Sequence, residues 1–118
     1  MDIEQFRAYC LSKKGVTEEF PFDKSTLVFK VSTKMFALSG LERLPFQVNL
    51  KCNPNRSIEL REAYVEIQPG YHMNKKHWNT IIPSPSFPPS LFYELIDHSY
   101  QLVTDTLSKR QKEILNSL

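Results

Sequence analysis

The residues best suited to chemistry lie in one stretch, residues 69–80. It holds two of the three histidines, the only tryptophan and an adjacent pair of lysines: His72, His77, Trp78, Lys75 and Lys76. Pro69-Gly70 marks a turn at its start, and residues 78–82 are typical of a strand because they are aromatic or β-branched. The sequence therefore predicts a basic, aromatic loop that leads into a strand, with the Trp78 indole anchoring the loop to the core.

Such a loop could bind nucleic acid, since lysines contact phosphates while an aromatic ring stacks on a base. Lys30, Asn49 and Lys51, on the expected exposed face of the sheet, could extend the surface. The candidate nucleic-acid-binding residues are Tyr71, His72, Asn74, Lys75, Lys76, His77 and Lys51. The alternative interpretation is a solvated surface loop whose Trp78 simply packs inward. In that case Asp97 and Tyr100 are expected to hydrogen-bond to the loop from the long helix. In that interpretation Trp78, Asp97 and Tyr100 are structural anchors.

Metal binding is not expected. His72 and His77 are five positions apart, whereas two histidines on one helical face are four apart. No cysteine or carboxylate stands beside them, and His98 lies on a distant predicted helix. We therefore expect no metal.

Nothing in the sequence predicts catalysis. Cys10 lies on the apolar face of the first predicted helix, and no histidine is placed to activate Cys52 beside Lys51. Asp97, His98 and Ser99 cannot form a relay, because consecutive helical side chains point about 100° apart. With only three glycines there is no phosphate-binding loop. We expect neither enzymatic activity nor a cofactor.

The composition predicts one soluble domain spanning residues 1–118. The net charge of +2 is weak, so nucleic-acid affinity would require local clustering of charge. Two cysteines are too few for a disulfide framework and are expected to be reduced, which suits the cytoplasm. The N-terminus does not resemble a signal peptide, and no apolar run approaches the roughly 18 residues of a membrane span.

The elements that must position the loop are predicted from periodicity and caps. Asp2 and Gln5 form a capping box that starts the first helix, and Gly15 ends it. Residues 17–25 are expected to be a loop, and residues 32–34 a tight turn between two strands. The other predicted elements are strands over 26–31, 35–38, 46–51, 64–68 and 78–82, and helices over 54–63 and 89–107, with a last helix opened by Ser108 and Gln111.

Strict alternation in the strands predicts an antiparallel sheet with one buried and one wet face. The order is helix, three strands, helix, two strands and two helices. We therefore predict an α+β fold, a two-layer sandwich with the helices packed on one face of the sheet.

Residues 71–78, YHMNKKHW, resemble the signature of the MmcQ/YjbR-like family of small bacterial proteins. Residues 15–22, 50–54 and 96–100 are similar to the family's opening, strand-to-helix junction and long-helix motif. The resemblance covers nearly the whole chain. It implies the CyaY-like (frataxin-like) arrangement, described as a double-wing DNA-binding motif.

The resemblance to frataxins raises iron as a ligand. Iron-binding frataxins present a dense acidic surface on the first helix and strand, whereas acidic residues here are diluted by Arg7, Lys13 and Lys14. Hard cations require several converging oxygen ligands, so iron binding is disfavoured.

The function expected from the family resemblance is that of a DNA-binding protein, monomeric and cytoplasmic, contacting phosphates through the basic-aromatic loop. The alternative is a protein-interaction or small-ligand-binding module without catalytic activity. A contiguous positive surface through Lys51, Lys75 and Lys76 would favour nucleic acid. An apolar pocket with a few convergent polar groups would favour a small ligand.

Overall fold

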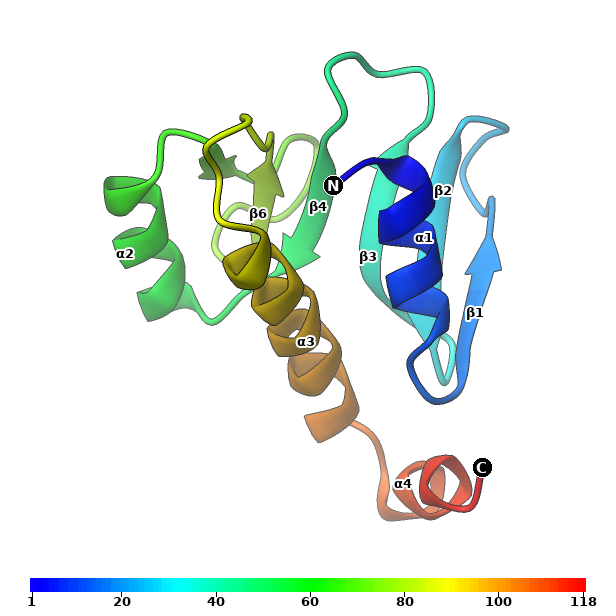
Figure 1. The fold of residues 1–118 in the computed structure, drawn as a ribbon. Helices are drawn as coiled ribbons and strands as arrows, with labels where there is room; N and C mark the ends of the chain where they lie inside the picture. Colours follow the sequence, from blue (N-terminus) through cyan, green and yellow to red (C-terminus); the bar gives the residue numbers. More distant parts are fainter.

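A computed structural model describes residues 1–118 and shows one twisted antiparallel sheet with helices against one face (Figure 1). The six strands lie in the order β1-β2-β3-β4-β6-β5. Their bounds are β1 Val16–Glu19, β2 Thr26–Val31, β3 Lys34–Gly40, β4 Val48–Lys51, β5 Ile67–Pro69 and β6 Trp78–Ile81. The α+β class and the antiparallel sheet with helices on one face are confirmed.

Two helices, α1 (Ile3–Leu11) and α3 (Pro89–Asp105), cover the inner face of the sheet (Figure 1). The predicted capping box of α1 is present: the Gln5 backbone N–H donates to Asp2 Oδ1 at 2.8 Å, and the Asp2 backbone N–H donates to Gln5 Oε1 at 3.0 Å. Gly15 ends this segment with φ at +73°, a conformation that favours glycine. Helix α2 (Pro54–Ala63) lies near β5, and α4 (Lys109–Asn116) ends the chain.

Aromatic rings fill the core between the helices and the inner face. Phe6 of α1 makes edge-on contacts with Phe29 of β2 and Phe92 of α3, with ring centroids 5.6 and 6.4 Å apart. Such aromatic pairs add about 0.5–1.5 kcal/mol beyond the burial of their area. This cluster fixes both helices against the sheet.

The prediction of a loop over residues 17–25 was wrong for residues 17–19. These residues belong to β1, which pairs with β2 from Val16 opposite Val31 to Glu19 opposite Val28. Its sequence, VTEE, has little apolar character, so its periodicity did not indicate a strand. Pairing with β2 supplies its hydrogen bonds, and Arg7 of α1 donates to Glu18 at 2.6 Å. Pairing with β2 thus makes this segment a strand although its own preference for strand is weak.

Two strand boundaries also differ from expectation. Strand β4 begins at Val48 and not at residue 46, although the Phe46 ring still faces the core and stacks on Phe92 at 6.4 Å. Strand β5 begins at Ile67, because Tyr64 caps α2 through a backbone hydrogen bond to Leu60. The turn over residues 32–34 is confirmed, with Ser32 and Thr33 at φ +47° and +69°.

The face of the sheet opposite the helices, here called the outer face, is not wet along its length as the alternation predicted. Val28, Leu38 and Trp78 form a second buried cluster there, with Met35 and Met73 packed against it. The reason is that residues 70–77 fold over this face, as the Met73 contact shows. The alternation predicted that this face is exposed to solvent, and the loop buries part of it.

Both cysteines are free and buried, as predicted. Burial raises the pKa of the Cys10 thiol to about 12, and it also raises the pKa of Cys52. Cys10 belongs to the same buried core cluster as Phe6. No helix is long and apolar enough to cross a lipid bilayer.

We predict that Cys10 is unreactive in the native protein. In a Cys52→Ser variant, a thiol reagent at pH 8 is expected to label Cys10 only as fast as the protein unfolds, because the thiolate is scarce and shielded. The measurement is labelling kinetics with and without denaturant. Rapid stoichiometric labelling of the folded variant would contradict the buried placement.

Candidate functional site

The loop over residues 70–77 is held flat against Trp78. The Gly70 N–H donates to the Trp78 carbonyl at 2.9 Å, and the Trp78 N–H donates to the Asn74 carbonyl at 3.0 Å. A Cβ atom at Gly70 would lie 2.8 Å from Trp78 Cβ and 3.0 Å from Met73 Cβ. Only glycine allows this close approach, so the predicted Pro-Gly turn has a packing role.

Asn74 shapes the second half of the loop. Its Oδ1 accepts hydrogen bonds from the backbone N–H groups of Lys76 at 3.0 Å and His77 at 3.2 Å. This is an Asx turn, which short amide side chains favour. Asn74 is one of the predicted nucleic-acid-binding residues, and its side-chain oxygen is used within the loop.

Arg61 of α2 anchors the loop from beneath. Its Nε donates to Asn79 Oδ1 at 2.8 Å, and its Nη2 donates to the carbonyls of Lys75 and of Trp78, the latter at 3.2 Å. Asn79 is only 2% exposed, so this pairing satisfies a buried polar group. Sequence reasoning missed Arg61, because its position in a polar helix gave no sign of the contact.

The expected anchoring of the loop by Asp97 and Tyr100 was wrong. Asp97 Oδ1 accepts from Tyr9 Oη at 2.6 Å and from Lys13 Nζ, and Tyr100 Oη donates to the Lys14 carbonyl at 2.6 Å. Both residues therefore fasten α1 to α3. They cannot reach the loop, because α3 covers the inner face and the loop covers the outer one. The third predicted anchor, Trp78, is 5% exposed and is confirmed as a core residue.

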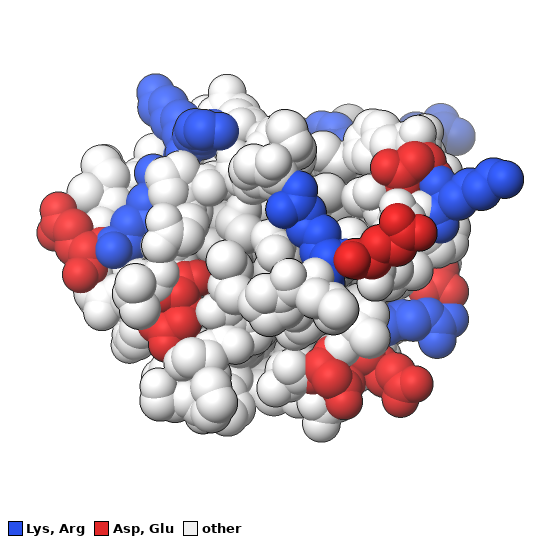
Figure 2. Space-filling view, turned by 90° about the horizontal axis from the view of Figure 1, so that it is seen from above, with Lys and Arg blue, Asp and Glu red and all other residues white.

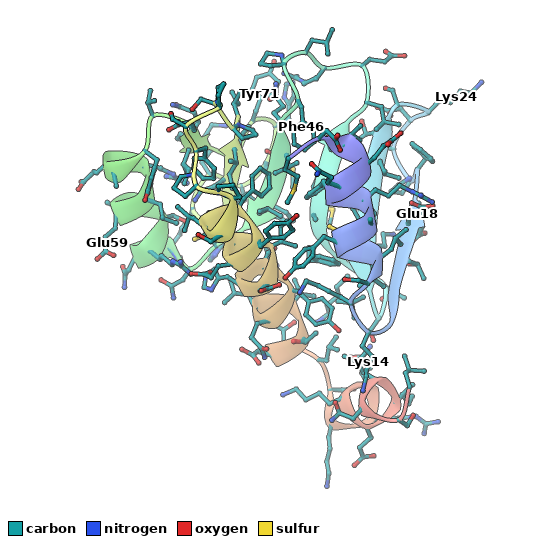
Figure 3. The ribbon with its side chains drawn as sticks, in the orientation of Figure 1. Lys14, Glu18, Lys24, Phe46, Glu59 and Tyr71 are labelled. Atoms are coloured by element: carbon teal, nitrogen blue, oxygen red, sulfur yellow. The ribbon has the colours of Figure 1, made fainter.

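A pocket of about 530 Å³ opens on the outer face. Its apolar part is formed by Met35, Leu38, Val48, Met73 and Trp78, and its remaining lining by Phe22, Thr26, Gly40, Arg43, Gln47, Asn49, Tyr71, His72 and Asn74. Three connections meet around it: the β1–β2 loop, the β3–β4 loop and the loop over residues 70–77. Figure 3 shows Tyr71 at the same end of the molecule as the β3–β4 loop.

Arg43 is the one lysine or arginine at the rim of the pocket. The Arg43 guanidinium lies over the Tyr71 ring, 4.2 Å from its centroid, and the Tyr71 and His72 rings are 4.0 Å apart. His72 has φ at +58°, which is uncommon outside glycine and is often found at functional sites. No aspartate or glutamate lines the pocket.

The predicted nucleic-acid-binding residues are not brought together. Tyr71, His72 and Asn74 line the pocket, whereas Lys51 and His77 line a separate depression of about 300 Å³. Lys51 Nζ lies 5.8 Å from the Trp78 ring centroid, and Lys75 Nζ folds back to donate to the Gly70 carbonyl at 3.2 Å.

On the face of the molecule seen in Figure 2, basic and acidic side chains are mixed. Figure 2 shows lysines and arginines separated by acidic side chains and by wide uncharged areas. The charge on this face is therefore not a continuous basic surface. No group of three His, Cys, Asp or Glu side chains is close enough to hold a metal ion.

We predict that Arg61→Met destabilises the protein by about 1–3 kcal/mol, because it leaves the buried side-chain oxygen of Asn79, Oδ1, without a hydrogen-bond donor. The measurement is urea denaturation followed by Trp78 fluorescence. Arg110→Met on the exposed face of α4 is the matched control, expected to change stability by less than about 0.5 kcal/mol. Equal effects of the two changes would contradict the anchoring role of Arg61.

Comparison with known proteins places this arrangement in a family. A family model described as YjbR matches residues 11–102. The chain is 32% identical to the uncharacterized protein YjbR of Escherichia coli K12 over the full length of both chains, and 42% identical to the uncharacterized protein YbdF of Escherichia coli O157:H7 over 80% of this chain and 77% of that protein.

Solved structures share the fold. The crystal structure of protein DR2400 of Deinococcus radiodurans, a DUF419 domain, superposes with a TM-score of 0.92 at 39% identity over 98% of this chain and 88% of that one. A protein of Pseudomonas syringae superposes with a TM-score of 0.73 at 29% identity, over 86% of this chain and 98% of that one. With the fold and the family model in agreement over most of its length, the chain belongs to the YjbR family.

Proposed function

We propose that this protein is a binding module that takes a small, flat organic molecule in the pocket of the outer face. The observation that carries the proposal is the pocket itself: an apolar floor over Leu38 and Trp78, rimmed by a few polar groups. Its volume of about 530 Å³ falls within the roughly 300–1,000 Å³ typical of small-molecule sites. It fits the alternative function that the sequence left open.

The side-chain amides of Asn49 and Asn74 support the proposal that the pocket binds a ligand. Asn49 Oδ1 accepts a hydrogen bond from Thr80, and Asn74 Oδ1 is used within the loop. The NH₂ groups of both side chains make no hydrogen bond to protein, and both residues line the pocket. They are donors available to a ligand that enters it.

The proposed role is binding without catalysis. The lining holds no carboxylate, cysteine or lysine, so His72 has no partner within the pocket for general acid–base chemistry. The buried free thiols support a reducing compartment, the cytoplasm.

The pocket can be tested with a neutral aromatic probe, N-phenyl-1-naphthylamine. We predict saturable binding, seen as enhanced probe fluorescence and as quenching of Trp78, the only tryptophan. Gly40→Leu should weaken the affinity about tenfold, because a side chain at Gly40 points toward Arg43 at the mouth, with Cβ 3.3 Å from Arg43 Cγ.

Ser90→Leu adds the same side chain to an exposed position at the start of α3 and serves as the control. It should leave the affinity unchanged. Absence of saturable binding to the folded wild type, or equal loss in both variants, would contradict the proposed pocket.

A second candidate function is nucleic-acid binding through the basic-aromatic loop. The observation that favours it is local charge: residues 67–93 contain no aspartate or glutamate, and Tyr71, Lys75 and Lys76 are exposed. The double-wing resemblance points the same way. Lysines of this kind bind by neutralising phosphates, with Lys51 as a neighbouring cation.

The corresponding prediction concerns salt dependence. If the loop binds duplex DNA, replacing Lys75 and Lys76 by alanine should weaken binding to every sequence and flatten the plot of log K against log salt by about 0.9 per lost phosphate contact. The measurement is titration of duplex and single-stranded DNA between about 50 and 200 mM salt.

Replacing Lys109 and Lys112 of α4 by alanine is the charge-matched control. An equal loss in the control would mean generic attraction to positive charge, and no saturable binding by the wild type at about 50 mM salt would reject this candidate.

A further inference from the structure

Arg43 is the one lysine or arginine that lines the outer-face pocket, and no acidic residue shares the pocket with it. Three of the other four arginines are engaged: Arg7 pairs with Glu18, Arg56 pairs with Glu94, and Arg61 donates to Asn79. The fourth, Arg110, is exposed on α4 and lies outside the pocket. The Arg43 guanidinium has no carboxylate partner and makes no hydrogen bond to protein. A full positive charge therefore stands unpaired at the mouth of an apolar cavity.

The Tyr71 ring holds this charge in place. With the guanidinium carbon 4.2 Å from the ring centroid, the cation is stacked on the ring face. Stacking uses the face of the guanidinium and leaves the N–H donors on its edge free, and that edge matches the two oxygens of a carboxylate or sulfonate. Arg43 is thus positioned to accept an anion without giving up its contact with Tyr71.

We propose that the pocket selects a planar aromatic monoanion. Its ring lies against Leu38 and Trp78, and its anionic group pairs with the Arg43 guanidinium. This rests on the proposed function, since it names the class of ligand for the same pocket.

The charge count favours one negative charge over two. Arg43 supplies one positive charge, and no second lysine or arginine lines the cavity. Lys51 and His77 lie in the other depression. A phosphate monoester carries close to two charges at neutral pH, so half of its charge would enter a partly apolar cavity without a partner, which is unfavourable. An aromatic carboxylate or sulfonate carries one negative charge, which the single positive charge of Arg43 balances.

The test compares ligands that differ in charge. The neutral probe N-phenyl-1-naphthylamine is compared with its sulfonate relative, 8-anilinonaphthalene-1-sulfonate, and 1-naphthoate with 1-naphthyl phosphate. The sulfonate should bind about tenfold or more tightly than the neutral probe, in line with a charge-assisted hydrogen bond. The naphthoate should bind more tightly than the naphthyl phosphate, and only the anions should weaken as salt is raised.

Arg43→Gln isolates the ionic contact. It should reduce the affinity for the sulfonate about tenfold or more and change the affinity for the neutral probe less than about twofold, because the cavity keeps its shape. Arg110→Gln removes the same charge from α4 and should alter neither affinity. Circular dichroism of each variant checks that the fold is retained.

The outcomes separate the two proposals. If the folded wild type does not bind the neutral probe saturably, the pocket itself is rejected. If it binds the neutral probe but the sulfonate gains nothing, or if Arg43→Gln and Arg110→Gln have equal effects, the pocket stands and the monoanion assignment is overturned. Tighter binding of naphthyl phosphate than of naphthoate also overturns it and indicates a phosphate ligand.

Discussion

The burial of one indole ring, that of Trp78, on the side of the sheet without helices determines how the outer face is built. The ring joins Val28 and Leu38 in a cluster that helices do not cover. The loop over residues 70–77 closes this cluster, and it can lie close enough only because Gly70 has no side chain. Removing the ring would take away both the support of the loop and the floor of the pocket.

The two faces of the sheet are stabilised by different means. On the inner face, aromatic packing is reinforced by the fully buried Ser99 of α3, whose hydroxyl donates to the Phe36 carbonyl and accepts from the Lys51 N–H at 2.9 Å. It bridges β3 and β4, which pair over only two residue pairs. The loop over residues 70–77 is instead held by polar contacts, because Arg61 of α2 donates to Asn79 Oδ1 and to the backbone carbonyls of Lys75 and Trp78. The loop is therefore stabilised separately from the main core.

The outer-face pocket gives a common explanation for features that look unrelated in the sequence. His72 has a left-handed backbone, Arg43 is a cation without a carboxylate partner, and Phe22 is 64% exposed. All three line one cavity at which three loops meet. Loops held on a rigid sheet are a common place for ligand recognition.

The sequence alone determined the elements with strong local signals and most of the architecture. Capping boxes, Gly15, the apolar stripe of α3 and strand alternation all act over a few residues, so they are visible without the fold. The family signature likewise identified residues 71–78 as the distinctive segment and Trp78 as its buried anchor.

Only the tertiary structure decided what these residues do. Whether Asp97 and Tyr100 hold the loop or α1 depends on which face of the sheet α3 covers, and alternation cannot assign a face to a distant loop. Strand β1 exists because β2 provides its hydrogen bonds. The pocket joins Phe22, Arg43 and Tyr71 from three connections, and contacts between residues so far apart in the chain arise from packing, for which short-range periodicity carries no signal.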